Sequence, residues 1–267
     1  MTDAPDPSPA PEAELATTPS RWTRWLAGRS VLALAVSVVA LGFAAAPYLS
    51  PEVLGGRVRA YLLAHPEVLD EAVAVRQARE DAGRVDAINA AVAANPALLR
   101  PDPRDPTFGP ANAKVTVIEF FDFRCPGCKA VAEDYLRLMR SQPDVRFVFK
   151  DWPILDRGGE PISQYAARAA LAAHQQGKYL EVYEALMSER SLTRDSIDRV
   201  LATHGIAAPQ AAAAIASPET SRHIADIHTT AATFKLTGTP TFLINGKTTP
   251  NIDPAEVLKA IEAAKAG

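Results

Sequence analysis

Apolar and polar residues divide the chain into segments of different kinds. Residues 1–20 are rich in proline, alanine and acidic side chains and show no apolar periodicity, so residues 1–29 are predicted to form a disordered tail. An uncharged run follows. Its apolar part extends from Val31 to Ala46 and, with its flanks, is long enough to span a bilayer, since about 20 helical residues cross the hydrocarbon layer. Residues 30–49 are therefore predicted to be a transmembrane anchor.

The flanks of this run indicate its orientation and leave open whether it is cleaved. Trp22 and Trp25 stand where interfacial aromatic residues are found, and arginines are more frequent before the run than after it. This bias places the tail in the cytoplasm and the rest of the chain outside, where disulfides can form. A cleaved signal peptide is the alternative, because Ala44-Ala45-Ala46 offers a small-residue site, although Pro47 would then hinder processing.

Residues 50–100 are predicted to form helices without a core of their own. Val53, Leu54 and Val58 begin an apolar stripe at helical spacing. An amphipathic helix must bury such a stripe on something, which favours self-association, and a solvated stalk is the alternative. Residues 101–110 contain four prolines and are predicted to be a linker.

The pattern changes after the linker, and residues 111–267 are predicted to form an α/β domain. Val115 to Phe123 is a nearly continuous β-branched and aromatic run, typical of a strand buried on both faces. A helical stretch and a second strand, 145–150, follow it, which indicates a parallel β-α-β unit. Residues from about 157 to about 236 show only helical spacing and are predicted to be a helical insertion.

The last part of the domain carries a turn signal. Asn245-Gly246, between two short apolar runs, predicts a β-hairpin. Asp253 and Pro254 then provide the N-cap and the first-turn proline of a final helix.

Composition and cysteine count exclude several classes of function. The formal net charge is −3 with 22% charged residues, which gives no reason to expect a nucleic-acid partner. Cys125 and Cys128 are the only cysteines, and they supply half of the four ligands that a structural zinc site needs. The five histidines form no second pair with ligand spacing, so no metal is predicted. A structural disulfide between residues so close would remove little chain entropy.

A redox dithiol fits the position of the two cysteines. Cys125 follows a buried strand and precedes a helix, so the first N–H groups of the helix and its dipole favour the thiolate and lower its pKa. We therefore expect Cys125 to be the exposed nucleophile. Cys128 lies one turn into the helix and is expected to stay a thiol until it resolves a mixed disulfide.

Two charged residues are candidates for proton transfer. Alternation along the strand places Glu119 on the same face as Val117 and Phe121, where a carboxylate is unfavourable unless it has a use. Glu119 is therefore a candidate to carry the proton of Cys128, with an edge-strand acid near solvent as the alternative. Lys150 ends the second strand and is expected either beside Glu119 or in solvent.

Two motifs more than 110 residues apart carry a family resemblance. The stretch "IEFFDFRCPGCK", with an acid six residues before the first cysteine, resembles the active-site signature of the DsbA-like branch of the thioredoxin fold. "TGTPTFLING" resembles the cis-proline loop of that branch, and the resemblance covers about residues 105–267. "RAYLLAHPEVLDEA" is similar to the N-terminal helical region of ScsC-like, oligomer-forming relatives.

The resemblance implies a fold and a set of site residues. The fold is α/β, a thioredoxin fold with a helical insertion, preceded by a transmembrane helix and an N-terminal helical segment. Cys125–Cys128 would form the redox-active disulfide, Pro240 would be cis, and Thr239 would present its backbone to an extended substrate. Pro126 and Gly127 would tune the potential, and Gly127 departs from the Pro-His pair of strongly oxidising members.

The resemblance also implies a function and its partners. We expect a thiol-disulfide oxidoreductase with no cofactor beyond its dithiol, acting on cysteine-containing proteins and served by a redox partner protein. Its location would be the bacterial inner membrane, single-pass through residues 30–49 with the catalytic domain in the periplasm, or the periplasm after signal cleavage. A disulfide isomerase or reductase that forms a homo-oligomer through residues 51–100, and a non-catalytic thioredoxin-like scaffold, are the alternatives.

Overall fold

The computed structural model describes residues 32–45 and 51–267, and the tail predicted over residues 1–29 lies outside them. The chain divides into two compact units, Met1–Ala74 and Val75–Gly267.

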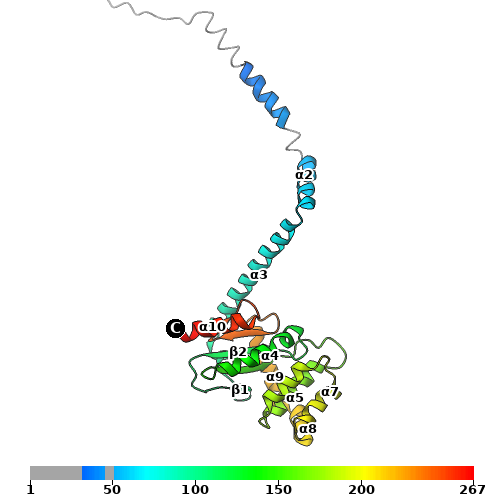
Figure 1. The fold of residues 1–267 in the computed structure, drawn as a ribbon, viewed down its shortest axis with the longest axis vertical. Helices are drawn as coiled ribbons and strands as arrows, with labels where there is room; N and C mark the ends of the chain where they lie inside the picture. Colours follow the sequence, from blue (N-terminus) through cyan, green and yellow to red (C-terminus); the bar gives the residue numbers. More distant parts are fainter. Residues whose placement is uncertain (1–31, 46–50) are drawn as a thin grey trace, which may run out of the picture. The chain divides into compact units, whose positions relative to one another are not determined.

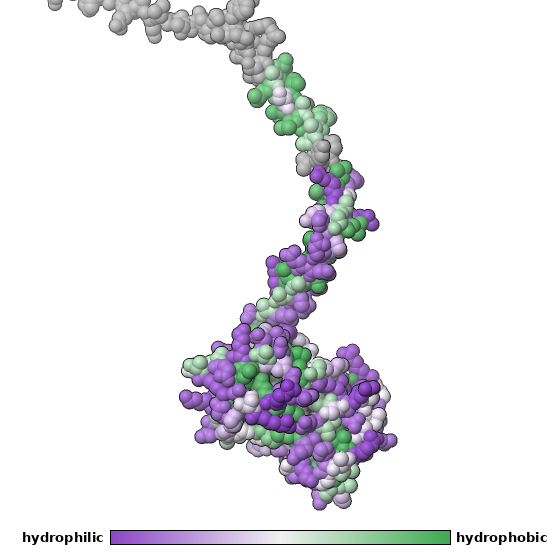
Figure 2. All heavy atoms as spheres, viewed as in Figure 1, coloured by the Kyte–Doolittle hydropathy of each residue, from purple (hydrophilic) through white to green (hydrophobic). Residues whose placement is uncertain are grey.

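The first unit consists of helices with exposed side chains. A helix over residues 32–45, rich in apolar side chains (Figure 2), is followed by α2, Pro51–Ala64, and by the first part of α3, Glu67–Ala94. Among the described residues, no helix is both long enough and apolar enough to span a membrane. The predicted anchor, residues 30–49, extends at both ends beyond the described part of the chain.

Helix α2 carries the apolar stripe expected from the sequence. Val53, Leu54, Val58 and Tyr61 are between 41% and 56% exposed, and no residue of α2 is buried. The stripe therefore lies on the surface of the chain as the structure describes it.

The later part of α3, residues 75–94, belongs to the second unit and contributes to its core. Ile88 and Val92 are buried in one cluster with apolar residues of the sheet. The side chain of Asn89 accepts a hydrogen bond from the backbone N–H of Thr248 at 2.8 Å. The structure thus differs from the coreless helices expected over residues 50–100, because the end of α3 packs on the domain.

The second unit is built on a five-stranded sheet of order β1-β3-β2-β4-β5 (Figure 1). The strands are β1 (Thr107–Phe108), β2 (Thr116–Phe121), β3 (Arg146–Asp151), β4 (Thr241–Ile244) and β5 (Lys247–Thr248). Strands β2 and β3 pair in parallel, as predicted, and β4 runs antiparallel to β2. Asn245 and Gly246 have φ angles of 46° and 82°, the positive values that a tight hairpin turn requires.

Helices cover both faces of this sheet. The helices of this unit after α3 are η1 (Pro96–Leu99), α4 (Pro126–Ser141), α5 (Ile162–His174), α6 (Tyr179–Ser188), α7 (Arg194–Thr203), α8 (Ala208–Ala216), α9 (Pro218–Thr233) and α10 (Pro254–Ala266), of which α7 and α8 pack on other helices. Phe121 and Phe149 face the cluster that includes α4, α6 and α10, whereas Phe120 and Val148 face the cluster that includes α9. No strand lies between β3 and β4, as expected for a helical insertion.

The segment predicted as a linker, residues 101–110, is part of the domain. It contains β1, which pairs antiparallel with β3, and Asp105, which is 2% exposed. The prolines therefore shape a fixed segment that closes one edge of the sheet. The segment is ordered because its strand pairs with β3 through backbone hydrogen bonds, which the composition of the segment does not reveal.

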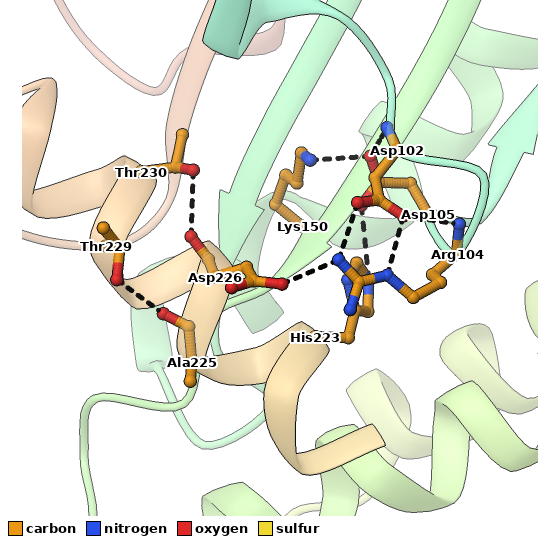
Figure 3. A network of polar contacts seen from close by, with 9 residues as sticks. All are labelled: Asp102, Arg104, Asp105, Lys150, His223, Ala225, Asp226, Thr229 and Thr230. Atoms are coloured by element: carbon orange, nitrogen blue, oxygen red, sulfur yellow. Dashed lines mark hydrogen bonds and ion pairs between the residues drawn. The ribbon is translucent and has the colours of Figure 1, made fainter. Parts of the chain in front are cut away.

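A buried polar network joins this segment to β3 and α9 (Figure 3). Lys150 Nζ lies 2.6 Å from Asp105 Oδ2, and their side chains are 7% and 0% exposed. His223 Nε2 of α9 lies 3.3 Å from the other oxygen of Asp105. Arg104 adds contacts of 2.7 Å to both Asp102 and Asp226. Lys150 offsets part of the cost of burying Asp105, whereas Oδ1 of Asp105 and both ring nitrogens of His223 have no hydrogen-bond partner.

Removing the cation of this network tests its importance. Lys150→Met leaves the Asp105 carboxylate buried without its counterion, so we expect the free energy of unfolding in urea to fall by about 3–5 kcal/mol. The double variant Asp105→Asn/Lys150→Met should recover much of the loss. Arg140→Met is the control, because its pair with Glu184 is exposed and should contribute about 0–1 kcal/mol. Equal losses for Lys150→Met and Arg140→Met would contradict the assignment.

Candidate active site: a dithiol under the cis-proline loop

The two cysteines lie at the point where β2 gives way to α4. Cys125 is the N-cap residue of α4, and Pro126 and Gly127 form its first turn with Cys128. Both cysteines are free thiols in this structure. Cys125 is 8% exposed and Cys128 is fully buried, so Cys125 is less open than the exposed nucleophile expected from the sequence. Cys125 is nevertheless the more exposed of the two cysteines, as expected, because only its side chain has accessible surface.

The loop before β4 covers Cys125. The bond Thr239–Pro240 is cis, as the family resemblance implied. The Cys125 thiol donates a hydrogen bond of 3.1 Å to the backbone carbonyl of Thr239. A Cβ added to Gly127 would stand 3.4 Å from Cδ of Pro240 and 3.7 Å from Sγ of Cys125. Glycine at this position therefore leaves the space between the dithiol and the loop free of a side chain.

The pKa values of the two thiols are shifted in opposite directions. The pKa of Cys125 is lowered to about 5, chiefly by the hydrogen-bonding thiol of Cys128, against the effect of burial, with further contributions from the side chain of Thr239 and the backbone N–H groups of Cys128 and Gly127. The pKa of Cys128 is raised, first by burial and then by Cys125 and by the charge of Glu119. The site therefore holds one thiolate beside one thiol at neutral pH.

Glu119 lies behind the dithiol on the face that the alternation predicted. It is fully buried, and the hydroxyl of Tyr183 on α6 donates to its two oxygens at 3.4 Å each. Burial raises the pKa of Glu119 well above its usual value, Tyr183 opposes the shift and the charge of Asp151 adds to it. The charge of Glu119 contributes to the raised pKa of Cys128, and both side chains are buried on the same side of the sheet.

Lys150 lies on the other side of the sheet. In the register of β2 and β3, Glu119 stands opposite Phe149, whereas Lys150 stands opposite Phe120. Phe120 belongs to the cluster that α9 covers, and Lys150 binds Asp105 there. The expectation that Lys150 sits beside Glu119 or in solvent is therefore wrong, because successive side chains of a strand point to opposite faces.

Asp122 fixes the active-site loop and was not singled out from the sequence. Its carboxylate is 2% exposed and accepts hydrogen bonds from the N–H of Arg124, from the N–H groups of Ile154 and Leu155, and from the Ser163 hydroxyl, at 2.8–3.0 Å. It thereby joins the loop before Cys125 to the start of the helical insertion. The bond to the N–H two residues on is an Asx-turn, the one signal that the sequence offered.

The rim of the site is open to solvent and partly apolar. Arg124 and Pro126 flank Cys125 and are exposed. Ile252 is 38% exposed, and its Cδ1 would stand 3.5 Å from a Cβ at Gly127. In the described part of the chain, no group of three or more histidine, cysteine or acidic residues is arranged to hold a metal ion.

Sequence comparisons match two parts of the chain. Residues 102–263 match the family described as thioredoxin, and residues 53–82 match the family described as the N-terminal domain of copper resistance protein ScsC. The chain is 32% identical over 145 residues to the Na(+)/H(+) antiporter NhaA 3 of Salinispora tropica, over 54% of this chain but 22% of that protein. The chain thus spans less than a quarter of that curated relative.

Two further relatives are covered over more of their length. The chain is 30% identical over 142 residues to the thiol:disulfide interchange protein DsbA of Haemophilus influenzae, which is 51% of this chain and 69% of DsbA. A thioredoxin-like oxidoreductase from Silicibacter pomeroyi superposes with a TM-score of 0.57 at 34% identity, over 62% of this chain and 95% of that one. The chain therefore belongs to the thioredoxin family, in the branch of thiol-disulfide oxidoreductases related to DsbA and ScsC.

Proposed function

We propose that this protein forms or rearranges disulfides in cysteine-containing proteins outside the cytoplasm, through the Cys125–Cys128 dithiol. The observation that carries the proposal is the opposite shift of the two thiol pKa values under the cis-proline loop. Exchange needs one sulfur that is readily a thiolate and a second that is protonated until it attacks. A scaffold that only binds would need neither property.

In the oxidising direction, a substrate thiolate attacks Sγ of Cys125 in the Cys125–Cys128 disulfide. The S–S bond breaks with its electron pair on Cys128, which takes up a proton. A second substrate thiolate then attacks the substrate sulfur of the mixed disulfide, and Cys125 leaves as a thiolate. The substrate loses two electrons and the dithiol gains two, so a redox partner protein must reoxidise the dithiol before the next cycle.

The pKa of Cys125 bears on the direction of the reaction. A value of about 5 lies between those of about 7 for thioredoxin and about 3.5 for DsbA. A more acidic thiol leaves faster and stabilises the reduced protein, which makes the disulfide a stronger oxidant. We therefore propose that the Cys125–Cys128 disulfide is a weaker oxidant than that of DsbA. The intermediate pKa of Cys125 also suits an isomerase. Gly127 supplies no side chain to stabilise the thiolate, which is consistent with that position on the scale.

Glu119 is proposed to carry the proton of Cys128. Its carboxyl group is buried on the same side of the sheet as Cys128, and burial raises its pKa well above the usual value. A protonated Glu119 can give its proton to the Cys128 thiolate that leaves, and an ionised Glu119 can take it back. Lys150 has no place in this transfer, since it lies on the opposite face.

The backbone beside the cis-proline is proposed to bind substrate. Thr239 O lies 3.1 Å from Sγ of Cys125, so a peptide joined to that sulfur would run along residues 239 and 240. Strand addition would align it through main-chain hydrogen bonds, with the apolar side chain of Ile252 beside it. The proposed substrates are therefore extended or unfolded segments around a cysteine.

The location is proposed from the apolar segment before α2. Residues 30–49 would anchor the chain in the bacterial inner membrane with the dithiol in the periplasm, or would be cleaved to release it there. Two observations support an oxidising compartment, where such a dithiol can be reoxidised. They are the apolar helix over residues 32–45 and the similarity to DsbA, which covers 69% of that protein.

Thiolate absorbance against pH tests the assignment of the nucleophile. In Cys128→Ser the serine hydroxyl still donates to Cys125, so the midpoint should lie near pH 5 and the thiolate should persist above it. In Cys128→Ala the donor is lost and the midpoint should rise. Cys125→Ser should show no titration in this range. A midpoint near the unperturbed value of about 8.5 in Cys128→Ser would contradict the proposal.

Replacing the buried acid tests proton transfer. Glu119→Gln fills the same space but cannot take a proton, so we expect the exchange rate at pH 6–8 to fall by about 100-fold while Cys125 still titrates. Near-ultraviolet circular dichroism should confirm an intact fold. Glu133→Gln, an exposed residue on α4, is the matched control and should exchange like the native protein. Equal rates for all three proteins would show that Glu119 has no part in catalysis.

The exposed stripe of α2 supports a second candidate, a disulfide isomerase that works as a homo-oligomer. Val53, Leu54, Val58 and Tyr61 are exposed, and residues 53–82 match the ScsC N-terminal family. Several tethered sites would raise the effective concentration of dithiols around a misfolded substrate between two exchanges. We propose that α2 and the start of α3 associate through this stripe.

Light scattering on truncated chains tests self-association. A protein starting at Pro51 should be oligomeric, and one starting at Val75, which keeps the buried residues Ile88 and Val92, should be monomeric. Leu54→Asp/Val58→Asp in the longer protein should dissociate it and reduce isomerase activity, but leave the thiolate titration unchanged. If both truncated proteins are monomers, the helices are a stalk and simple oxidation is the better function.

A further inference from the structure

Glu119 is not the only acid buried on its side of the sheet. Asp151, the last residue of β3, is 1% exposed and stands opposite Phe121 in the parallel register, two residues from the Glu119–Phe149 pair. The alternation of β3 directs Asp151 to the same face as Phe149, toward α4 and α6. Two carboxyl groups thus share the apolar space behind Cys128.

Two tyrosines of α6 hold these two acids. The hydroxyl of Tyr179 donates to Oδ2 of Asp151 at 3.0 Å, and that of Tyr183 donates to Glu119. Tyr179 and Tyr183 are one helical turn apart, with ring centroids separated by 6.1 Å. Oδ1 of Asp151 is buried and has no hydrogen-bond partner. Asp151 is therefore held in place by one side-chain hydrogen bond. Its charge is stabilised less than that of Asp122, which accepts from four donors.

The charges of the two acids oppose each other. Burial raises the pKa of Asp151 to about 8, Tyr179 opposes the shift, and the charges of Asp105 and Asp122 add to it. The charge of Asp151 in turn raises the pKa of Glu119. Both acids are screened little by water, so ionising one makes ionising the other less favourable.

The groups that face this pair come from every surrounding element. Glu119 acts on Cys128 and Tyr135 of α4 and on Tyr179 and Tyr183 of α6. Asp151 accepts from Tyr179, and the charges of Asp105 and Asp122 act on it. Two cations are nearby but bind other groups: Lys150 pairs with Asp105 on the opposite face, and Lys129 of α4 interacts with Cys128 and Asp122. Neither Glu119 nor Asp151 forms an ion pair with a described residue, so no bound cation offsets the repulsion between them.

We propose that Asp151 is a positioning residue of the exchange reaction: held by Tyr179 beside Glu119, its charge determines when Glu119 carries the proton that Cys128 gives up or takes back. The inference rests on the proposed function. Its step is the resolution of a mixed disulfide at Cys125. Cys128 gives its proton to ionised Glu119 and attacks Sγ of Cys125, and the bound partner leaves as a thiolate that solvent protonates.

The pH profile of this step tests the proposal. The full-length reduced protein is mixed with oxidised glutathione, and release of the second glutathione is followed against pH. Asp151→Asn removes the charge that opposes ionisation of Glu119, so the midpoint of the pH profile should fall by about one pH unit. At a pH below the midpoints of both proteins, the variant should then release glutathione about tenfold faster than the native protein. Tyr179→Phe removes the hydrogen bond that stabilises ionised Asp151, so Asp151 carries less charge at a given pH. The midpoint should therefore shift in the same direction.

The double variant Glu119→Gln/Asp151→Asn distinguishes this role from a structural one. It should match Glu119→Gln, because Asp151 acts through Glu119. A shift that persists in the double variant, or an unchanged profile in Asp151→Asn, overturns the inference. Infrared titration of the protonated carboxyl groups provides a readout without activity: two coupled transitions are expected in the native protein, and Tyr179→Phe should move the Asp151 transition to higher pH. This variant keeps Asp151, so it also tests the inference if Asp151→Asn does not fold.

Failure of the inference and failure of the proposed function give different results. If the native protein releases no second glutathione, or if Glu119→Gln leaves the profile unchanged, the roles of Cys128 or Glu119 are wrong and the inference is overturned with them. If Glu119→Gln changes the profile and Asp151→Asn does not, the proposed function stands and only the role of Asp151 is overturned.

Discussion

The free-energy cost of taking carboxyl groups out of water governs how this domain is organised. Asp105, Glu119, Asp122 and Asp151 are each at most 2% exposed, and each is stabilised in a different way. Asp105 has the cation of Lys150, and Asp122 has hydrogen bonds from three N–H groups and a hydroxyl. These two acids join loops and helices to the sheet. Glu119 and Asp151 have one tyrosine each, too little to fix their charge, and they lie behind the dithiol.

The parts of the site that follow from alternation and turn chemistry could be predicted from the sequence. The period of β2 placed Glu119 toward the helix of Cys128, and the strand-to-helix junction placed Cys125 before Cys128. Alternation within β3 does not tell which of its residues share a face with Glu119, because that depends on the register with β2. Lys150 was expected beside Glu119 or in solvent, but Phe149 stands opposite Glu119 and Lys150 is buried against Asp105.

Other elements carry too weak a pattern to be predicted. Helices α5 and α8 are rich in alanine, and their buried positions, such as Ala166, Ala170 and Ala214, do not stand out as an apolar stripe. Residues 101–110 resemble a linker because of their prolines, and the strand pair and the ion pair of Asp105 depend on residues far away in sequence. Long-range partners of this kind are set by packing, which local composition does not contain.

The two thiols are coupled through one proton. The main cause of the low pKa of Cys125 is the thiol of Cys128, which acts as donor only while it keeps its proton. Gly127 contributes its backbone N–H but has no side chain that could replace the lost donor when Cys128 ionises. A thiolate on Cys128 therefore removes the stabilisation of a thiolate on Cys125, and the site favours one negative sulfur at a time. In the proposed mechanism Glu119 and Asp151 control the proton of Cys128, and through that proton they act on both sulfurs.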